Sequence, residues 1–297
     1  MKATAYLIKR NSKLFFKDKG MFFTSLITPG ILLVLYATFL SNVYKDSFSA
    51  NLPTGITLPE GIINALVGGQ LISSLLAVSC VTVAFCANFL SVQDKVNGSI
   101  KDLKMSPVKP SELAIGYYAA TLVSTLIICL SAAALSLAYV AIGGWYMSAA
   151  DVVCFILDSI LIVFFGTALS SVINFFLSSQ GQLSAVGTIV SAGYGFICGA
   201  YMPISSFGSG LQKVVSLLPG TYGTSLLRNH ALRGALFEME AQGIPSEVIT
   251  SLRDALDCNV YFFGKAVSLP VMYLILGCTV LLLVGVYILI NALKKKS

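Results

Sequence analysis

The fold is decided by an uncharged stretch in the first third of the chain, residues 62–92, which reads IINALVGGQLISSLLAVSCVTVAFCANFLSV. It contains no Lys, Arg, Asp or Glu. An α-helix rises about 1.5 Å per residue, so about 20 apolar residues cross the roughly 30 Å of hydrocarbon in a bilayer. The stretch therefore predicts a helix that spans a membrane.

Five further windows are similarly apolar, and only Asp158 interrupts one of them. The six predicted spans cover about residues 21–40, 62–92, 113–142, 152–177, 183–202 and 266–293. Of all residues 56% are hydrophobic and 11% are charged, which excludes a soluble domain. We predict an all-α, polytopic membrane protein whose transmembrane domain takes up residues 20–297. The first window is too long for a signal peptide's apolar region, and we expect it to be retained.

The cations predict the orientation in the cell membrane. They cluster before the first span, between spans two and three, and after the sixth: Lys2, Lys9, Arg10, Lys13, Lys17, Lys19, Lys95, Lys101, Lys104, Lys109, Lys294, Lys295 and Lys296. Because positive loops stay inside, both termini are expected in the cytoplasm. The net charge of +6 then reflects topology and contact with anionic lipid, and it does not imply nucleic acid.

Residues 1–19 predict an amphipathic helix in the membrane interface. Its apolar side chains fall on one side of a helical wheel: Leu7, Ile8, Leu14 and Phe15. Most of its cations fall on the other side, where they meet lipid headgroups. Two alternatives stay open, a simple anchor for the terminus or part of a platform for a cytoplasmic partner.

The polar connection between spans two and three, residues 93–112, holds a short helical pattern that Pro107 ends. Val96, Ile100 and Leu103 recur at helical spacing and form one narrow apolar face. This face either docks a partner or lies against the membrane surface or neighbouring loops.

The same connection resembles the cytoplasmic loop of type-2 ABC exporter permeases, which couples to an ATPase. The resemblance rests on Gly98-Ser99-Ile100, Leu103 and Ser106-Pro107-Val108, with Asp94 and Lys95 keeping the expected charges. Val96, Asn97 and Lys101 depart from the family's acidic pattern. A second likeness, to the signature at the outer end of the fifth span, runs through residues 199–204, 218–222 and Leu227-Arg228.

The resemblance implies an ATP-driven exporter for an amphipathic or hydrophobic substrate, such as a peptide, drug or lipid-like molecule. It implies a second permease chain, identical to this one, and two separate cytoplasmic ATPase subunits that hold ATP and magnesium. Spans one, two and five would move. The implied ATPase-coupling residues are Asp94, Val96, Gly98, Ser99, Ile100, Leu103 and Pro107. The implied exit-gate residues are Pro203, Pro219, Tyr222 and Arg228.

An external region, residues 204–262, separates the last two spans. Residues 204–218 are apolar but too short to cross the bilayer, which predicts re-entrant helices, with a tilted surface loop as the alternative. Residues 235–259 mix acidic and apolar side chains and predict a small helical cap. That cap is best explained as a solvated cover; the alternatives are that it receives substrate from the pore or recognises an outside ligand.

Asp158 is the one ionisable residue deep within a predicted span. Three alternatives stay open: it lines the substrate path, it bonds across a subunit interface, or it lies close to the outer face. Gln70, Asn88 and Asn174 are weaker candidates for the path, and each is better explained as a hydrogen-bonding contact between helices.

Several absences argue against an enzyme. The chain lacks a Gly-x-x-x-x-Gly-Lys-Ser/Thr phosphate loop and a Gly-x-Ser-x-Gly elbow. Its one histidine, His230, lies outside a His-Glu-x-x-His pattern, and the seven cysteines, of which Cys258 alone is outside the spans, predict no metal site. No catalytic residue and no cofactor is therefore expected in this chain. The alternative functions are an ion-gradient-driven secondary transporter or channel and a membrane scaffold or sensor.

Overall fold

The computed structural model describes residues 2–35, 38–39, 41–42, 45, 58–106 and 108–293, and most of them are helical. In chain order the helices are α1 (Lys2–Lys17), α2 (Lys19–Leu35), α4 (Glu60–Val96), α5 (Ser99–Met105), α6 (Pro110–Gly143), α7 (Ala149–Phe176), α8 (Gln180–Ile197), α9 (Ser209–Val215), α10 (Pro219–Ala241), α11 (Ser246–Ala255) and α12 (Leu269–Leu293). A 3₁₀ turn, η2 (Ile204–Ser206), precedes α9, and a hairpin of β1 (Tyr261–Phe262) and β2 (Lys265–Ala266) precedes α12. The helical fold class is confirmed.

Four of the described helices are long and apolar enough to cross a membrane, namely α4, α6, α7 and α12. A fifth span results if α1 and α2, which meet at an angle of 74°, are counted together. The predicted total of six is not confirmed. The first predicted span is described without a break only as far as Leu35, and α8 ends at Ile197, with many small and polar residues that lower its apolarity.

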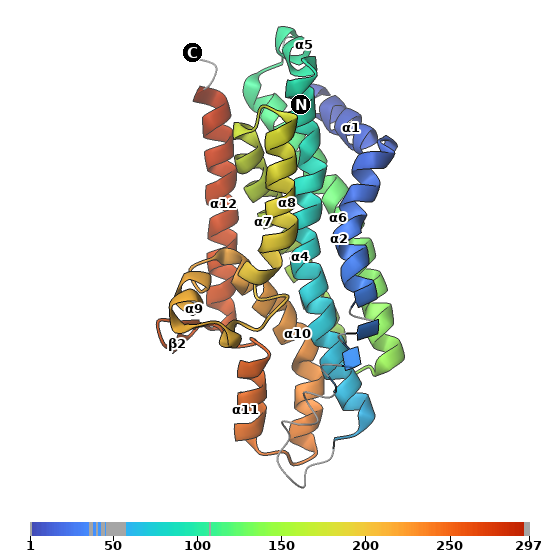
Figure 1. Cartoon of the computed structure of the whole chain (residues 1–297), viewed down its shortest axis with the longest axis vertical. Coiled ribbons are helices and arrows are strands. Elements are labelled where there is room, and N and C mark those ends of the chain that lie inside the picture. The colour runs from blue at the N-terminus through green and yellow to red at the C-terminus, as the bar shows by residue number, and fades with distance from the viewer. Residues whose placement is uncertain are drawn as a thin grey trace.

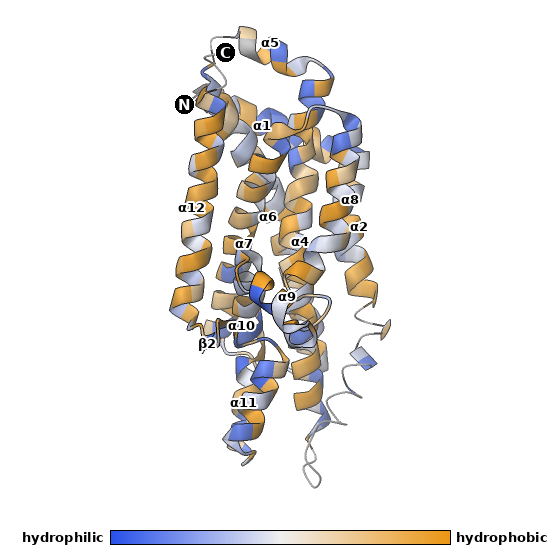
Figure 2. Ribbon diagram, turned by 60° about the vertical axis from the view of Figure 1, so that its left-hand side comes forward, coloured by the Kyte–Doolittle hydropathy of each residue, from blue (hydrophilic) through white to orange (hydrophobic). Residues whose placement is uncertain are grey.

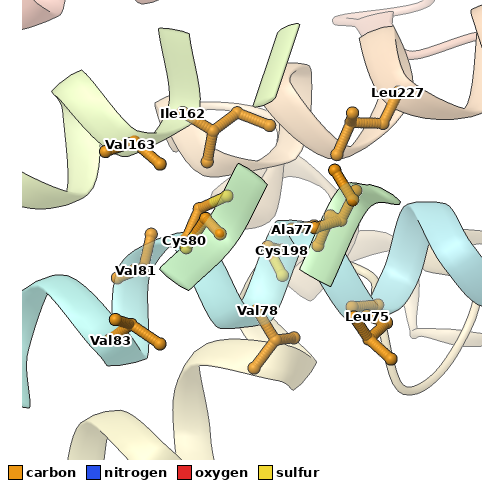
Figure 3. Packing of buried hydrophobic residues seen from close by; sticks show 14 of the residues in the cluster. Leu75, Ala77, Val78, Cys80, Val81, Val83, Ile162, Val163, Cys198 and Leu227 are labelled. Atoms are coloured by element: carbon orange, nitrogen blue, oxygen red, sulfur yellow. The ribbon is translucent and has the colours of Figure 1, made fainter. Parts of the chain in front are cut away.

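Helix α4 runs through the middle of the bundle and is buried along most of its length. Because its sequence is apolar on all sides, it is covered by neighbours on all sides: α2, α6, α7, α8 and α10 pack against it. Figure 3 shows part of the resulting core, where Ala77, Cys80 and Val81 of α4 meet Ile162 of α7 and Leu227 of α10.

The two ends of the bundle differ. Helix α5 lies at the same end as the two chain termini, whereas α11 lies at the opposite end (Figure 1). Figure 2 shows that hydrophobic residues dominate the long helices between these ends and that hydrophilic residues are frequent in α11. This arrangement fits the predicted placement of both termini on one side, although which side faces the cytoplasm stays a prediction.

The predicted cap, residues 235–259, forms the end of α10, the helix α11 and the loop after it. A second cluster of buried apolar residues joins this part to the start of α4 and includes Ile62, Leu236, Met239, Ile249 and Leu256. Residues 204–218 form η2 and the short, largely exposed helix α9, and their re-entrant character stays a prediction.

Candidate functional site

A sharp break separates α4 from α5. Gly98 has a φ of 81°, in the left-handed region where residues with a Cβ are strained. The glycine therefore lets the chain leave α4 and start the seven-residue helix α5 in a new direction. Ser99 is the first residue of α5 and is partly buried.

Two of the three residues of the predicted apolar face, Ile100 and Leu103, are covered from within the chain. Ile100 and Leu103 pack beside Leu7 of α1 and beside Leu113 and Tyr117 of α6. Val96, the third residue of that face, is 45% exposed, and docking of a partner and contact with the membrane surface or neighbouring loops both stay predictions. The side chains left exposed around α5 include Val96, Asn97, Lys101, Asp102 and Met105, and Pro107 lies outside the described residues.

Asp94 lies inside the bundle, one turn before α5. Its side chain is 8% exposed, and its Oδ2 atom accepts a hydrogen bond from Nη1 of Arg10 at 2.9 Å. The Tyr117 hydroxyl donates to the same oxygen. A residue expected to contact the ATPase is therefore placed where it joins α1 and α6 to the end of α4.

Lys95 makes a second junction at the same place. Its ammonium donates to the carbonyl oxygens of Asn174, Phe175 and Leu177, at 2.9, 2.8 and 3.1 Å. These carbonyls belong to the C-terminal end of α7, where a positive charge is favourable. From the sequence, Lys95 was one of the clustered cations and kept the charge expected in the coupling loop, but its contact with the end of α7 was not predicted.

Asp158 is fully buried between three helices. Its Oδ2 atom lies 2.6 Å from Nδ1 of His230 on α10, and the hydroxyl of Tyr273 on α12 donates to Oδ1. Asp158 stands nine residues after the start of α7 at Ala149, about 14 Å along the helix. The chain thus satisfies this carboxylate internally. His230 and Tyr273 were missed because they lie far from Asp158 in sequence.

The other polar candidates for a path are also buried in the bundle. Nδ2 of Asn88 donates to the hydroxyls of Ser170 and Ser171, which ties α4 to α7. Gln70 and Asn174 are buried, and their side-chain amides make no hydrogen bond within the part of the chain that is described. None of these residues lines either of the two large clefts described below.

The expected gate residues gather around the start of α10. Pro203 precedes η2, and Pro219 is the first residue of α10, where a proline costs no backbone hydrogen bond. The buried Tyr222 donates its hydroxyl to the carbonyl of Ser216, at the end of α9, at 2.6 Å. The structure therefore places Pro219, Tyr222 and Arg228 as one unit in the first half of α10, and Pro203 just before η2.

Arg228 is the most deeply buried charge of this unit, with 1% of its side chain exposed. Nη1 donates to Oδ2 of Asp257 at 2.8 Å, and Nη2 donates to the carbonyl of Gly199 at 2.7 Å and to the Ser74 hydroxyl at 3.3 Å. Asp257 follows α11 and was not predicted as a site residue. Arg228 thus joins α4, the end of α8 and the loop after α11.

Two clefts open on the bundle. The first has a volume of 820 Å³, lies between α2, α4 and α8, and is lined by apolar side chains and by hydroxyls such as those of Thr24, Thr28, Ser184, Thr188 and Ser191. The second has a volume of 780 Å³ and lies at the α5 end, between α4, α6, α7 and α12. A flexible molecule with apolar and hydrogen-bonding parts suits the lining of the first cleft.

Comparison with protein families agrees with this architecture. The family model for ABC-2 type transporters matches residues 2–231, from the start of α1 into α10. The chain belongs to the ABC-2 type transporter family. It is accordingly a transmembrane ABC permease, and permeases of the ABC-2 type normally work with a separate ATPase. The comparisons with curated proteins and with solved structures found no match.

The match covers α5 with the Asp94 and Lys95 junctions as well as the cleft between α2, α4 and α8. It ends before α11, Asp257 and α12. Among the described residues no group of His, Cys, Asp or Glu could hold a metal ion.

Proposed function

We propose that this ABC-2 permease is the membrane part of an ATP-driven exporter and that α5 receives the ATPase. The observation that supports this most directly is the position of α5, which stands at one end of the bundle and follows Asp94 and Lys95, the two residues near the end of α4 that bind α1, α6 and α7. A short helix with such attachments is suited to receive a force and pass it on.

The contact with the ATPase would use the exposed side of α5. Met105 is 84% exposed and Val96 is 45% exposed, and Lys101 and Asp102 are exposed between them. The opposite side, Ile100 and Leu103, packs on the permease itself. ATP and magnesium would be held by the partner subunits, two of which would serve a pair of permeases.

Movement of α5 would reach the bundle along two routes. The Asp94 carboxylate connects the end of α4 to α1 and α6, and the Lys95 ammonium connects it to the end of α7. Because nucleotide binding would favour one position of the ATPases, these connections would shift the population of the permease between two arrangements.

The substrate path would run along the 820 Å³ cleft between α2, α4 and α8. A second, identical permease facing this cleft would complete its wall. Apolar side chains with hydroxyls among them favour an amphipathic or hydrophobic substrate, moved out of the cell.

Co-purification tests the proposal. The tagged chain is expressed with a soluble ATPase that carries a phosphate-binding loop and is encoded beside it, and the complex is isolated in detergent. We expect the ATPase to co-purify and to hydrolyse ATP in a vanadate-sensitive manner. Met105→Asp should weaken the complex at least about tenfold, a loss of about 1.4 kcal/mol.

The matched control is Phe237→Asp, which places the same charge on a similarly exposed side chain of α10. This variant should bind the ATPase normally. If both variants bind equally well, α5 is not the docking helix. If the chain binds no ATPase but transports by itself in liposomes, the proposed exporter is wrong.

A secondary transporter is the second candidate, and the buried cluster of Asp158, His230 and Tyr273 favours it. Ionisable groups at such depth are typical of proton-coupled transporters. In this case the chain alone, reconstituted in liposomes, would move substrate in response to a pH gradient, and Asp158→Asn would abolish the response. ATP-dependent transport that persists in Asp158→Asn would argue against this candidate.

A further inference from the structure

The segment between α8 and α9, residues 199–206, is held against α10 by contacts that converge on one ion pair. We call this stretch the exit segment. At its start, the carbonyl of Gly199 accepts a hydrogen bond from Nη2 of Arg228 at 2.7 Å. Further along, the backbone N–H of Ile204 donates to Oδ2 of Asp257 at 2.9 Å. That same oxygen accepts Nη1 of Arg228 at 2.8 Å.

The backbone on both sides of the ion pair takes unusual conformations. Asp257 has a φ of 50°, in the left-handed region that a residue with a Cβ rarely adopts, so its surroundings must hold it there. Gly199 has a φ of 73°, and a Cβ at this position would lie 2.9 Å from Cγ1 of Ile204. Both the exit segment, at Gly199, and the loop after α11, at Asp257, therefore lie close to the ion pair.

The loop that carries Asp257 is fixed to α10 by separate bonds. The carbonyl of Cys258 accepts hydrogen bonds from the Ser225 hydroxyl at 2.8 Å and from Nδ2 of Asn229 at 2.6 Å. Nη2 of Arg253 donates to Oδ1 of Asn229 at 2.9 Å. Breaking the Arg228–Asp257 pair would thus loosen the exit segment and leave the loop attached to α10.

A cavity of 490 Å³ lies beside the ion pair, between the exit segment with α9 and the loop with the hairpin. Its lining includes Ser205, Lys213, Asp254, Asp257 and Asn259. A cavity of this size with charged and polar side chains in its lining offers water to Asp257 once it leaves Arg228, which lowers the cost of separating a buried ion pair.

We propose that the Arg228–Asp257 ion pair is a latch that holds the exit segment closed against α10, with Asp257 as a positioning residue. The role of the latch rests on the proposed function: in an exporter, its release would open the end of the substrate path that lies opposite α5. Its existence as a mechanical element can nevertheless be tested without transport.

Two native cysteines report on the latch. Cys198 adjoins the exit segment and is fully buried, and Cys258 follows Asp257 and is 1% exposed. Burial raises the pKa of the Cys258 thiol to about 12, so both its burial and its protonation make it unreactive. Release of the exit segment alone exposes Cys198, whereas loss of the whole cap exposes both.

The experiment uses Asp257→Asn, which keeps the shape of the side chain and removes its charge. Purified full-length protein in detergent is treated with a maleimide, and labelled cysteines are assigned by mass spectrometry. We expect at least a fivefold faster labelling of Cys198, with Cys258 unchanged. Arg228→Gln should give the same pattern from the other side of the pair.

Asp254→Asn is the matched control, because it removes a charge from the last turn of α11, three residues before Asp257, where the carboxylate accepts hydrogen bonds from the side chains of Asn259 and Tyr261. It should label as the parent protein does. Unchanged Cys198 labelling in Asp257→Asn, or equal labelling of Cys198 and Cys258, would overturn the latch. Selective Cys198 labelling without any effect on ATP-driven transport would support the latch and contradict its role in an exporter.

Discussion

At the scale of residues, this permease places charged side chains at the junctions between helices. Asp94, Asp158 and Asp257 are all buried, and each meets a cationic or ionisable partner on another segment. Removing one partner from a buried pair leaves a charge in a poorly solvated place, which costs about 3 to 5 kcal/mol. Single substitutions at these junctions should therefore have larger effects than substitutions on the exposed helix faces.

Lys95 gives the first residue-scale prediction. Lys95→Gln removes the charge that binds the three carbonyls at the end of α7. We expect the free energy of unfolding to fall by about 1 to 3 kcal/mol, the worth of hydrogen bonds to a charged group. Thermal unfolding in detergent measures the loss. Lys101→Gln, on the exposed side of α5, is the control and should unfold as the parent does.

Asp257 gives a prediction on pH. Burial raises its pKa above the ordinary carboxyl value, while Arg228 and the backbone of Ile204 and Ser205 oppose the rise. Because the pKa is higher in the folded chain than in the unfolded one, Asp257 takes up a proton before exposed carboxyls do as the pH falls. At pH values between the pKa of Asp257 in the unfolded chain and its higher pKa in the folded chain, acidification therefore increases the contribution of this group to the free energy of unfolding. The same protonation removes the charge that pairs with Arg228.

We accordingly expect the latch to open in acid without global unfolding. Labelling of Cys198 should increase as the pH falls from neutral, relative to Asp257→Asn measured at each pH, since that variant has no carboxyl to titrate. The unfolding temperature is measured over the same pH range, and the protonation of Asp257 should not lower it. If the ratio of Cys198 labelling rates in the parent protein and in Asp257→Asn is the same at every pH, the expectation is wrong.

At the scale of elements, the direction of α5 depends on one glycine. A Cβ at Gly98 would meet no atom within 4 Å, so Gly98→Ala adds only the strain of a left-handed residue, about 1 to 2 kcal/mol. We expect α5 to tilt and the stimulation of ATP hydrolysis by substrate to fall. Gly181→Ala, where a Cβ also meets nothing within 4 Å and φ is not positive, should retain stimulation.

The contact between α4 and α7 depends on another glycine. A Cβ at Gly166 would lie 2.7 Å from the carbonyl oxygen of Cys80 and 2.9 Å from Cα of Val81, both backbone atoms of α4. Gly166→Ala should therefore force the helices apart and cost about 1 to 3 kcal/mol, as overpacking does. Unfolding in detergent measures this cost, and Gly277→Ala on α12, with open space around it, should be neutral.

The elements show what sequence alone can predict here. Long apolar runs reflect the thickness of the bilayer, so the windows that became α4, α6, α7 and α12 were located from composition. The end of α8 could not be located in this way, because the glycines and hydroxyl residues of this helix lower its mean hydropathy. The site pairs were also missed: Arg10 and Asp94 are 84 residues apart, and His230 and Asp158 are 72 apart, distances that only helix packing brings together.

At the scale of the whole molecule, one side of the bundle has the features of an incomplete wall. The cleft between α2, α4 and α8 opens outward, and α2 exposes Phe23, Ile27 and Ile31 beside it, with α8 exposing Ile189. Hydroxyl groups lie among these apolar residues, and those of Thr24 and Thr188 donate within their own helices, to the carbonyls of Gly20 and Ser184 at 2.6 and 3.0 Å. The proposed second permease would cover this face with the same apolar and hydroxyl lining, and a two-fold symmetric pair is the simplest arrangement.

Cross-linking tests the pair. In a Cys278→Ala background, which removes an exposed native thiol, a cysteine at Thr188 should form a disulfide with its counterpart in the second chain, because residues near a two-fold axis face their own copies. The control is a cysteine at Leu281 of α12, which is 74% exposed and does not line the cleft. Dimers formed through position 281 and not through 188 would place the interface on α12. Since the cleft between α2 and α8 would then face lipid, the substrate path would have to be sought elsewhere in the molecule.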